Sequence, residues 1–179
     1  LISIGRTFNT AGLGLEEAGV ALGQRGEVLV DEGLRTSQPG VYAIGDITNR
    51  VQLAHAASAQ GLAAVEGILG RTRALDYNLI PSCVFTLPEI ASVGLSAEAA
   101  QEQGKKVRTG KFPFLASGKA LALGEEDGFV KVIADAETDR LLGVHIIGPH
   151  ASDLIAAAVV ALRDSLTAAE LAATIQAHP

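Results

Sequence analysis

A series of short apolar segments separated by turn-forming residues fills the second half of the sequence, and it constrains the fold more than any other feature. The segments read "CVFT", "IASVG", "KVRTGKFPF", "GFVKVIA" and "LLGVHIIG", and clusters of Gly, Pro, Asp and Glu divide them. Strands that follow one another through short turns pair in opposite directions. This part of the chain is therefore predicted to form an antiparallel sheet.

Helix signals flank the predicted strands. Ser96 is typical of a helix N-cap and predicts a short helix to about Gln103. Residues 152–163 carry apolar side chains at helical spacing, which predicts a longer amphipathic helix. Its predicted apolar face consists of Leu154, Ile155, Ala158, Val159 and Leu162. Residues 79–179 are therefore interpreted as an α+β domain, in which helices flank an antiparallel sheet.

A capping box and a proline define the C-terminal segment. Thr167 and Glu170 have the spacing of a capping box, which predicts a last helix that finishes near Ile175. Pro179 disfavours helical backbone at the residue before it, so His178 is expected to be extended. The segment thus presents an imidazole just beyond the end of a helix.

Residues 1–78 have a different pattern, in which strand-like runs alternate with turns and then give way to one long helix. The predicted strands are 1–5, 27–30 and 40–46. Residues 52–69 follow helical spacing, and Gly70 is placed to end that helix. We interpret this region as an incomplete α/β part that precedes the α+β domain, with a domain boundary near Leu79.

Composition places the chain among globular proteins and excludes several function classes. Apolar residues make up 48% and charged residues 19% of the sequence, which argues against disorder. The net charge of −6 is spread along the chain without a basic stripe, so a nucleic-acid partner is not expected. No unbroken apolar run has membrane-spanning length, so no membrane partner is expected either.

The single cysteine, Cys83, has no partner for an intramolecular disulfide and lies in an apolar run, where a buried, inert thiol is expected. With no secretory signal, this favours a reducing, aqueous compartment, the cytoplasm. The sequence contains no methionine and opens on what reads as part of a buried strand. We therefore expect a piece of a longer protein.

Two glycine-containing segments are candidates for nucleotide binding. The run from Gly12 to Gly19 has Glu17 in place of the third glycine of G-x-G-x-x-G, where it would obstruct a pyrophosphate, so we interpret the run as a connection. Gly45 and Asp46 follow a strand-like run, and a carboxylate there can accept hydrogen bonds from sugar-like hydroxyls. On the residues alone, an aspartate that ends a turn or caps a helix remains the alternative.

The segments "RTSQPGVYAIGD", "LAHAASAQG", "IPSCVFTLPEIASVGLS", "LLGVHIIGPHASDLI" and "AHP" occur in an order and spacing that resemble a known family. The chain is similar to the C-terminal portion of the flavin-dependent pyridine nucleotide-disulfide oxidoreductases, above all to members that oxidise dihydrolipoamide. The resemblance implies electron flow from a dihydrolipoyl dithiol through an enzyme disulfide and FAD to NAD. It also implies that residues 1–78 are the C-terminal remainder of the NAD/FAD-binding region, and that the redox cysteine pair and the glycine fingerprints precede Leu1.

The resemblance assigns roles to residues of this chain. Gly45 and Asp46 would belong to a flavin-binding motif, in which Asp46 holds a ribityl hydroxyl of FAD. His178 would reach across a dimer interface to the partner's disulfide and take a proton from the dithiol substrate. The helix whose backbone lies against the flavin would start with Gln52, Leu53, Ala54 and His55.

The resemblance also implies partners: a second copy of the chain, bound through residues 79–179, and the lipoyl domain of a 2-oxoacid dehydrogenase complex. The apolar face of the helix at 152–163 would then serve dimerisation, cover the domain's own sheet, or do both. Two alternatives stay open. The parent could be another family member, similar to mercuric or glutathione reductase, or the chain could act as a non-catalytic dimerisation fragment.

Some positions depart from the family pattern or invite another interpretation. Gln176 stands where the family usually has a histidine, and Phe8 and Leu87 replace common residues of their loops. The changes at Phe8 and Leu87 affect the subfamily more than the class. His145 and His150 lack zinc-like spacing, so His145 is interpreted as a sheet residue and His150 as a neighbour of a helix start.

Overall fold

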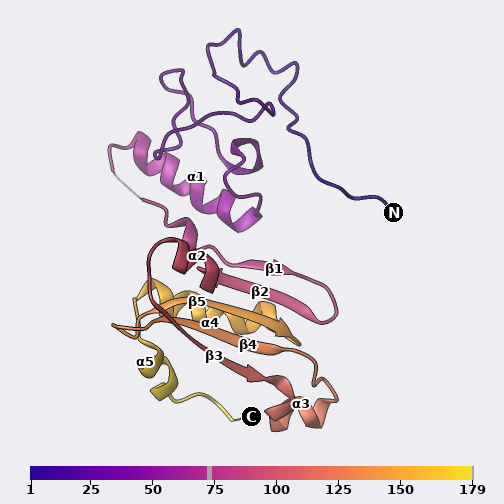
Figure 1. The fold of residues 1–179 in the computed structure, drawn as a ribbon. Helices are drawn as coiled ribbons and strands as arrows, with labels where there is room; N and C mark the ends of the chain where they lie inside the picture. Colours follow the sequence, from indigo (N-terminus) through magenta and orange to yellow (C-terminus); the bar gives the residue numbers. More distant parts are fainter. Residues whose placement is uncertain (72–73, 179) are drawn as a thin grey trace. The chain divides into compact units, whose positions relative to one another are not determined.

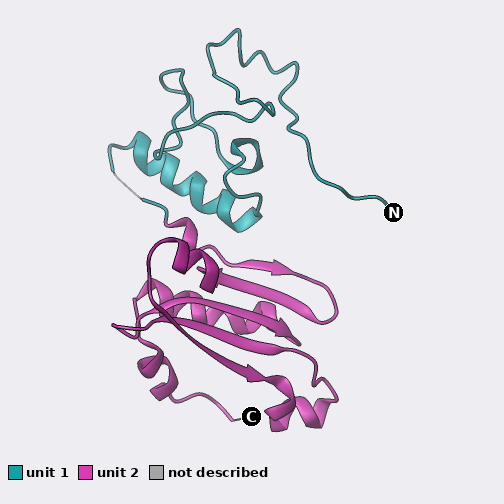
Figure 2. Ribbon diagram, in the orientation of Figure 1, with its two compact units in different colours: residues 1–75 teal, residues 76–179 magenta. Residues whose placement is uncertain are grey.

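The computed structural model describes residues 1–71 and 74–178, which divide into two units. Unit 1 is Leu1–Leu75 and unit 2 is Asp76–Pro179 (Figure 2). The boundary proposed from the sequence, near Leu79, lies a few residues beyond this division. Pro179, on which the expected backbone of His178 depends, lies outside the described residues.

Unit 2 is built on a five-stranded antiparallel sheet, which confirms the prediction. Its strands are β1 (Ser82–Val84), β2 (Glu89–Gly94), β3 (Val107–Pro113), β4 (Phe129–Asp135) and β5 (Leu141–Gly148). Their order across the sheet is β1-β2-β5-β4-β3, so β5 lies at the centre (Figure 1). There Val144 pairs with Val93 on one side and with Val132 on the other.

The core of unit 2 lies between one face of the sheet and α4 (Ala151–Arg163), which confirms the predicted long helix (Figure 1). Its buried members are Ala91, Val93, Leu141, Val144, Ile146, Ala151, Ile155, Ala158, Ala161 and Leu162. Each buried Leu, Ile or Val stabilises the fold by roughly 1.5–3 kcal/mol. Leu154, which the sequence places on the same apolar face, is 47% exposed, because one residue turns a helix by about 100° away from Ile155.

Shorter helices complete unit 2. They are η2 (Tyr77–Leu79), α2 (Ala97–Glu102), η3 (Phe114–Ala116), α3 (Gly118–Leu123) and α5 (Ala168–Ala173). The Ser96 hydroxyl accepts the Ala99 amide at 3.1 Å, which confirms the predicted cap of α2. The last helix, α5, ends before the predicted Ile175. Among the described residues, no helix combines the length and apolar character needed to cross a membrane.

Unit 1 contains one long helix, α1 (Ala54–Ile68), where the sequence predicts a helix over 52–69. Gly70, with φ of +73°, follows its end, and the Arg71 amide donates to the Glu66 carbonyl at 2.9 Å. This left-handed glycine is the predicted stop signal. A short 3₁₀-helix, η1 (Gly45–Thr48), precedes α1.

The strands predicted at 1–5, 27–30 and 40–46 do not form, and this part of the sequence prediction is wrong. Within residues 1–71, pairing is limited to isolated bridges from Val28 to Leu22 and from Tyr42 to Arg35. A strand is stable when a neighbour pairs with its N–H and C=O groups along its length. In unit 1 each bridge pairs only one residue with one other residue, so the apolar runs remain irregular.

Candidate functional site

A tight turn at Gly45 presents the Asp46 carboxylate. Gly45 has φ of +76°, and a Cβ there would lie 3.3 Å from the Cβ of Ala57 in α1, so the turn and the helix need a glycine between them. The Gly45 amide donates to Oε1 of Gln60 at 2.6 Å, and Gln60 is fully buried. The α1 side chain therefore fixes the backbone that carries Asp46.

Asp46 lies in η1 and not at the end of a strand, which corrects the sequence prediction. Residues 40–46 form no strand because no neighbouring segment pairs with them along their length. The Asp46 side chain is 58% exposed, and its Oδ2 lies 3.4 Å from Nη1 of Arg6. The carboxylate can therefore accept further hydrogen bonds from a ligand.

The start of α1 lies close in sequence to this turn, and its N-cap position carries no capping side chain. Helix α1 begins at Ala54, so Gln52 and Leu53 precede it and only Ala54 and His55 belong to its first turn. Leu53 is the N-cap, with extended backbone and no capping side chain. The first-turn amides and the helix dipole favour negative charge at such an end.

The fit of this turn to a flavin can be judged from its residues. A carboxylate that is open to solvent suits the hydroxyls of a ribityl chain, and the glycine at Gly45 leaves no Cβ beside it. The uncapped end of α1 suits an electron-rich ring system. The residues named from the sequence therefore fit the flavin group.

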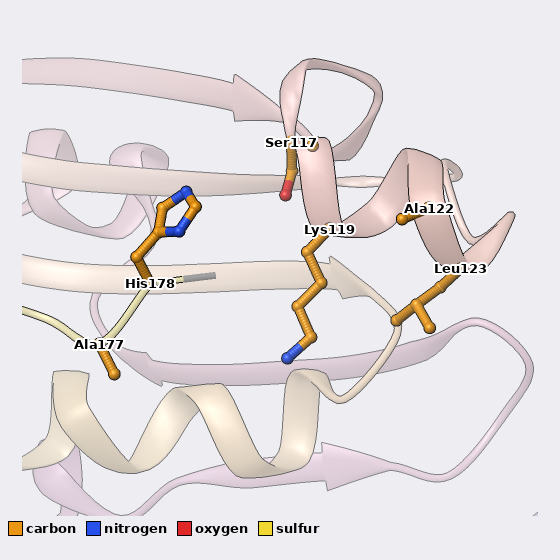
Figure 3. Close-up of a pocket in the computed structure, with 7 residues that line it drawn as sticks. Ser117, Lys119, Ala122, Leu123, Ala177 and His178 are labelled. Atoms are coloured by element: carbon orange, nitrogen blue, oxygen red, sulfur yellow. The ribbon is translucent and has the colours of Figure 1, made fainter.

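The C-terminal tail carries the second candidate residue. Helix α5 starts with the predicted capping box, in which the Thr167 hydroxyl accepts the Glu170 amide and the Glu170 carboxylate accepts the Thr167 amide. Beyond α5, residues 174–178 are not helical and His178 is exposed. His178 lines a pocket of about 570 Å³ together with Ser117 and Lys119. Figure 3 shows the imidazole ring on the opposite side of this pocket from Ser117 and Lys119. The imidazole is thus accessible from solvent.

Cys83, which the sequence predicts to be a buried, inert thiol, is only partly buried. It lies in β1 and is partly exposed, because β1 is an edge strand of the sheet. Partial burial, followed by the nearby charge of Glu89, raises the pKa of the Cys83 thiol. A raised pKa lowers the thiolate fraction and so makes this cysteine a poor nucleophile.

The remaining histidines have structural positions. His145 lies in β5, and its Nε2 is 3.1 Å from the carbonyl oxygen of Leu95. His150 is the N-cap residue of α4, with left-handed backbone. No group of three or more His, Cys, Asp or Glu side chains suited to a metal occurs among the residues that the structure describes. Gly12 and Gly19 lie in turns, as predicted.

Sequence reasoning missed several residues of the candidate site. Arg6 gave no signal, because its partner Asp46 is 40 positions away. Gln60 lies at helical spacing from the buried Ala56, Ala63 and Ala64, and a polar residue on such an apolar face indicates a buried hydrogen bond. Ser117 caps, and Lys119 lies in, the short helix α3, for which no signal was identified in the sequence.

Comparison with protein families gives two matches that together cover most of the chain. Residues 80–179 match the model described as the pyridine nucleotide-disulphide oxidoreductase dimerisation domain. Residues 1–61 match the model described as pyridine nucleotide-disulphide oxidoreductase.

Relatives with curated names cover the whole chain. It is 50% identical over 179 residues to a dihydrolipoyl dehydrogenase of Chlamydia trachomatis, and 47% identical over 180 residues to one of Bacillus subtilis. In both cases the match covers 100% of this chain and 38% of the relative. The chain thus spans well under half the length of these proteins.

Solved structures match the fold as well. LpdA from Mycobacterium tuberculosis matches with a TM-score of 0.93 and 35% identity, over 100% of this chain and 39% of that one. The HOCl-induced flavoprotein disulfide reductase RclA from Escherichia coli matches with a TM-score of 0.90 and 29% identity, over 98% and 41%. These matches confirm the predicted fold class, an α+β dimerisation domain preceded by part of a nucleotide-binding region.

Proposed function

Because this chain belongs to the pyridine nucleotide-disulphide oxidoreductase family, we propose that it is the C-terminal part of an enzyme that oxidises dihydrolipoamide with NAD. The observation that carries the proposal is the 50% identity to dihydrolipoyl dehydrogenases along all 179 residues. The parent protein would use FAD and a redox disulfide. The chain alone is expected to be inactive, because its one cysteine cannot form a redox pair.

The flavin-binding role falls to the turn at Gly45 and to the start of α1. Asp46 would accept hydrogen bonds from ribityl hydroxyls, and Arg6 would keep the carboxylate oriented. The first-turn amides of α1, which begins at Ala54, would stabilise negative charge on the ring. FAD, when bound, accepts two electrons from a dithiol and passes them to a nicotinamide. We assign no residue of this chain to NAD.

His178 is proposed as the general base for the dithiol. The thiolate, not the thiol, attacks a disulfide, and a neutral imidazole can take the thiol proton. The protonated imidazole is then a cation beside the resulting thiolate and stabilises its negative charge. The exposed, non-helical tail supports this role because the ring is accessible from outside its own unit.

A homodimer is proposed as the working form, with His178 delivered to the partner's disulfide. The dimerisation-domain match over residues 80–179 supports the association. The lipoyl domain of a 2-oxoacid dehydrogenase complex is the proposed carrier of the dithiol, and the cytoplasm is the proposed compartment.

A second candidate function is a flavoprotein disulfide reductase that moves electrons from a nicotinamide to a different substrate. The structural match to RclA, at a TM-score of 0.90, favours this alternative. A third is a dimerisation fragment with no chemistry of its own. The family match to a dimerisation domain favours it for the chain in isolation.

The decisive experiment measures dihydrolipoamide-dependent reduction of NAD by the full-length protein and its His178→Gln variant. General-base catalysis contributes about 10²–10⁴-fold, so we expect kcat to fall by at least about 100-fold while the protein stays yellow. His150→Asn is the matched control, because Asn tolerates the left-handed backbone of that exposed position. Unchanged kcat in His178→Gln would rule out the base, and a full-length protein without flavin would contradict the proposed function.

A further inference from the structure

Helix α5 directs the tail that carries His178, yet apolar packing holds it only weakly. The helix spans six residues and has no fully buried side chain. Its largest apolar residue, Leu171, is only partly buried against the core of unit 2. Helices this short are unstable on their own in water. Other contacts must therefore fix the direction of α5.

These contacts come from the turn between β4 and β5, at Asp139. The Asp139 Oδ2 accepts the Ala169 amide at 3.0 Å, and its backbone carbonyl accepts the Ala168 amide at 2.9 Å. Oδ1 of the same carboxylate pairs with the Arg108 guanidinium, which projects from β3. The Asp139 side chain is 26% exposed. One carboxylate thus joins the first turn of α5 to the edge strand of the sheet.

Arg140, the next residue in the chain, holds the segment that precedes α5. The Arg140 guanidinium donates to the Ser165 carbonyl at 3.0 Å, and its backbone forms an isolated antiparallel bridge with Thr167. The Leu141 amide donates to the Leu166 carbonyl at 2.9 Å. Residues 165–167, which precede α5, are therefore hydrogen-bonded to residues 140–141 at the start of β5. These bonds restrict the backbone where the helix begins.

We propose that Asp139, Arg108 and Arg140, here called the α5 clamp, are positioning residues that aim the tail and its imidazole. This inference rests on the proposed role of His178 as the general base. The clamp residues are separate from Asp46 and His178, and their described contacts are all within unit 2. It acts by fixing the base of a short helix whose far end leads to residues 174–178. A small tilt at that base moves the imidazole, and a misplacement of about 1 Å can cost up to about 100-fold in rate.

The same strand and turn provide a matched control. Lys106 precedes β3 and pairs with Glu137 of the β4–β5 turn at 2.9 Å, and the two side chains are 78% and 68% exposed. Among the described residues, no hydrogen bond joins this pair to α5. Lys106→Gln therefore removes an ion pair of the same kind from the same place without loosening the helix.

The first test measures hydrogen exchange and steady-state kinetics in the full-length protein. Asp139→Gly removes the carboxylate and tolerates the φ of +61°, and Arg108→Gln removes its partner. In both variants we expect amides of residues 168–174 to exchange about tenfold faster and kcat to fall about tenfold, with KM and flavin content unchanged. Arg108→Lys should restore part of kcat, and Lys106→Gln should match the wild type. Unchanged exchange in both clamp variants would overturn the inference.

The second test combines Asp139→Gly with His178→Gln. If the clamp acts through the imidazole, the double variant should be no slower than His178→Gln alone. A further loss of about tenfold in the double variant would show a general structural effect and would overturn the inference. Failure of the proposed function gives a different result, because His178→Gln would then keep wild-type kcat.

Discussion

Units 1 and 2 differ in how completely they satisfy their own backbone and apolar groups. Unit 2 has a five-stranded sheet, and its main core consists of ten buried residues from the sheet and α4. Unit 1 has one long helix, and its buried apolar cluster consists of Leu34, Ala63 and Ala64. The same chain therefore contains one part whose core can hold it together and one part whose core cannot.

Unit 1 compensates with local polar contacts in place of a sheet. The Ser37 hydroxyl accepts the Ala21 amide at 2.7 Å and donates to the Gly19 carbonyl at 2.8 Å. The Asp31 carboxylate accepts the amides of Gly33 and Arg35 at 2.8 and 2.9 Å. Each such bond contributes only about 0.5–1.5 kcal/mol net, so they shape the loops without providing a cooperative core.

The largest expected effect comes from separating the units. Residues 76–179 alone should unfold in one cooperative thermal transition, because their sheet and core lie within that range. Residues 1–75 alone should show no such transition by circular dichroism or calorimetry. A cooperative transition in residues 1–75 would break the comparison.

A pair of core substitutions in the 179-residue chain sharpens the comparison. Ile133 of β4 is 0% exposed and Leu34 of unit 1 is 1% exposed, so the two side chains are equally buried. Ile133→Ala should lower the free energy of unfolding of the main transition by about 2–5 kcal/mol, measured by urea denaturation. Leu34→Ala should leave that transition nearly unchanged. Equal losses in the two variants would show that the units unfold together.

The smallest expected effect is a change in the stability of unit 2 at acidic pH. Hydrogen bonds from the amide and hydroxyl of Ser152 lower the pKa of Glu89 below its ordinary value of 4.5. A carboxylate whose pKa is lowered by folding adds stability above pH 4.5, and this stability is lost as pH falls through the folded pKa. Glu89→Gln should therefore lose stability less steeply below pH 4.5.

Thermal unfolding followed from pH 7 to pH 3 checks this prediction. Glu102→Gln, at the exposed end of α2, serves as the control and should keep the wild-type slope. An unchanged slope in Glu89→Gln would show that the carboxylate at the start of α4 does not contribute to the acid sensitivity.

The sequence predicts unit 2 well because its signals are local. Alternating apolar residues and turn residues are sufficient to locate β1 to β5, and Ser96 and Thr167 mark helix starts through side chains that bond within three residues. Unit 1 has apolar runs of the same appearance, yet strands require partners along their length. The missing partner cannot be read from the run itself, so the predictions at 27–30 and 40–46 failed.

The candidate site divides in the same way. Gly45, Asp46 and His178 could be named from the sequence because the family resemblance marks them. The contacts that orient them could not be named. Arg6 meets Asp46 across 40 positions, and Arg108 meets Asp139 across 31. An exposed arginine on its own carries no sign of the carboxylate that it will meet in the folded chain.

The buried side-chain amide of Gln60 fixes the number of residues that can separate η1 from this position of α1. Its bond to the Gly45 amide joins two positions that are 15 residues apart, and most of the intervening chain lies in these two helices. One inserted or deleted residue within α1 before Gln60 would rotate that amide by about 100° about the helix axis. Length variation in this stretch would therefore detach the helix from the turn, whereas the surface loops of unit 1 can vary in length without this consequence.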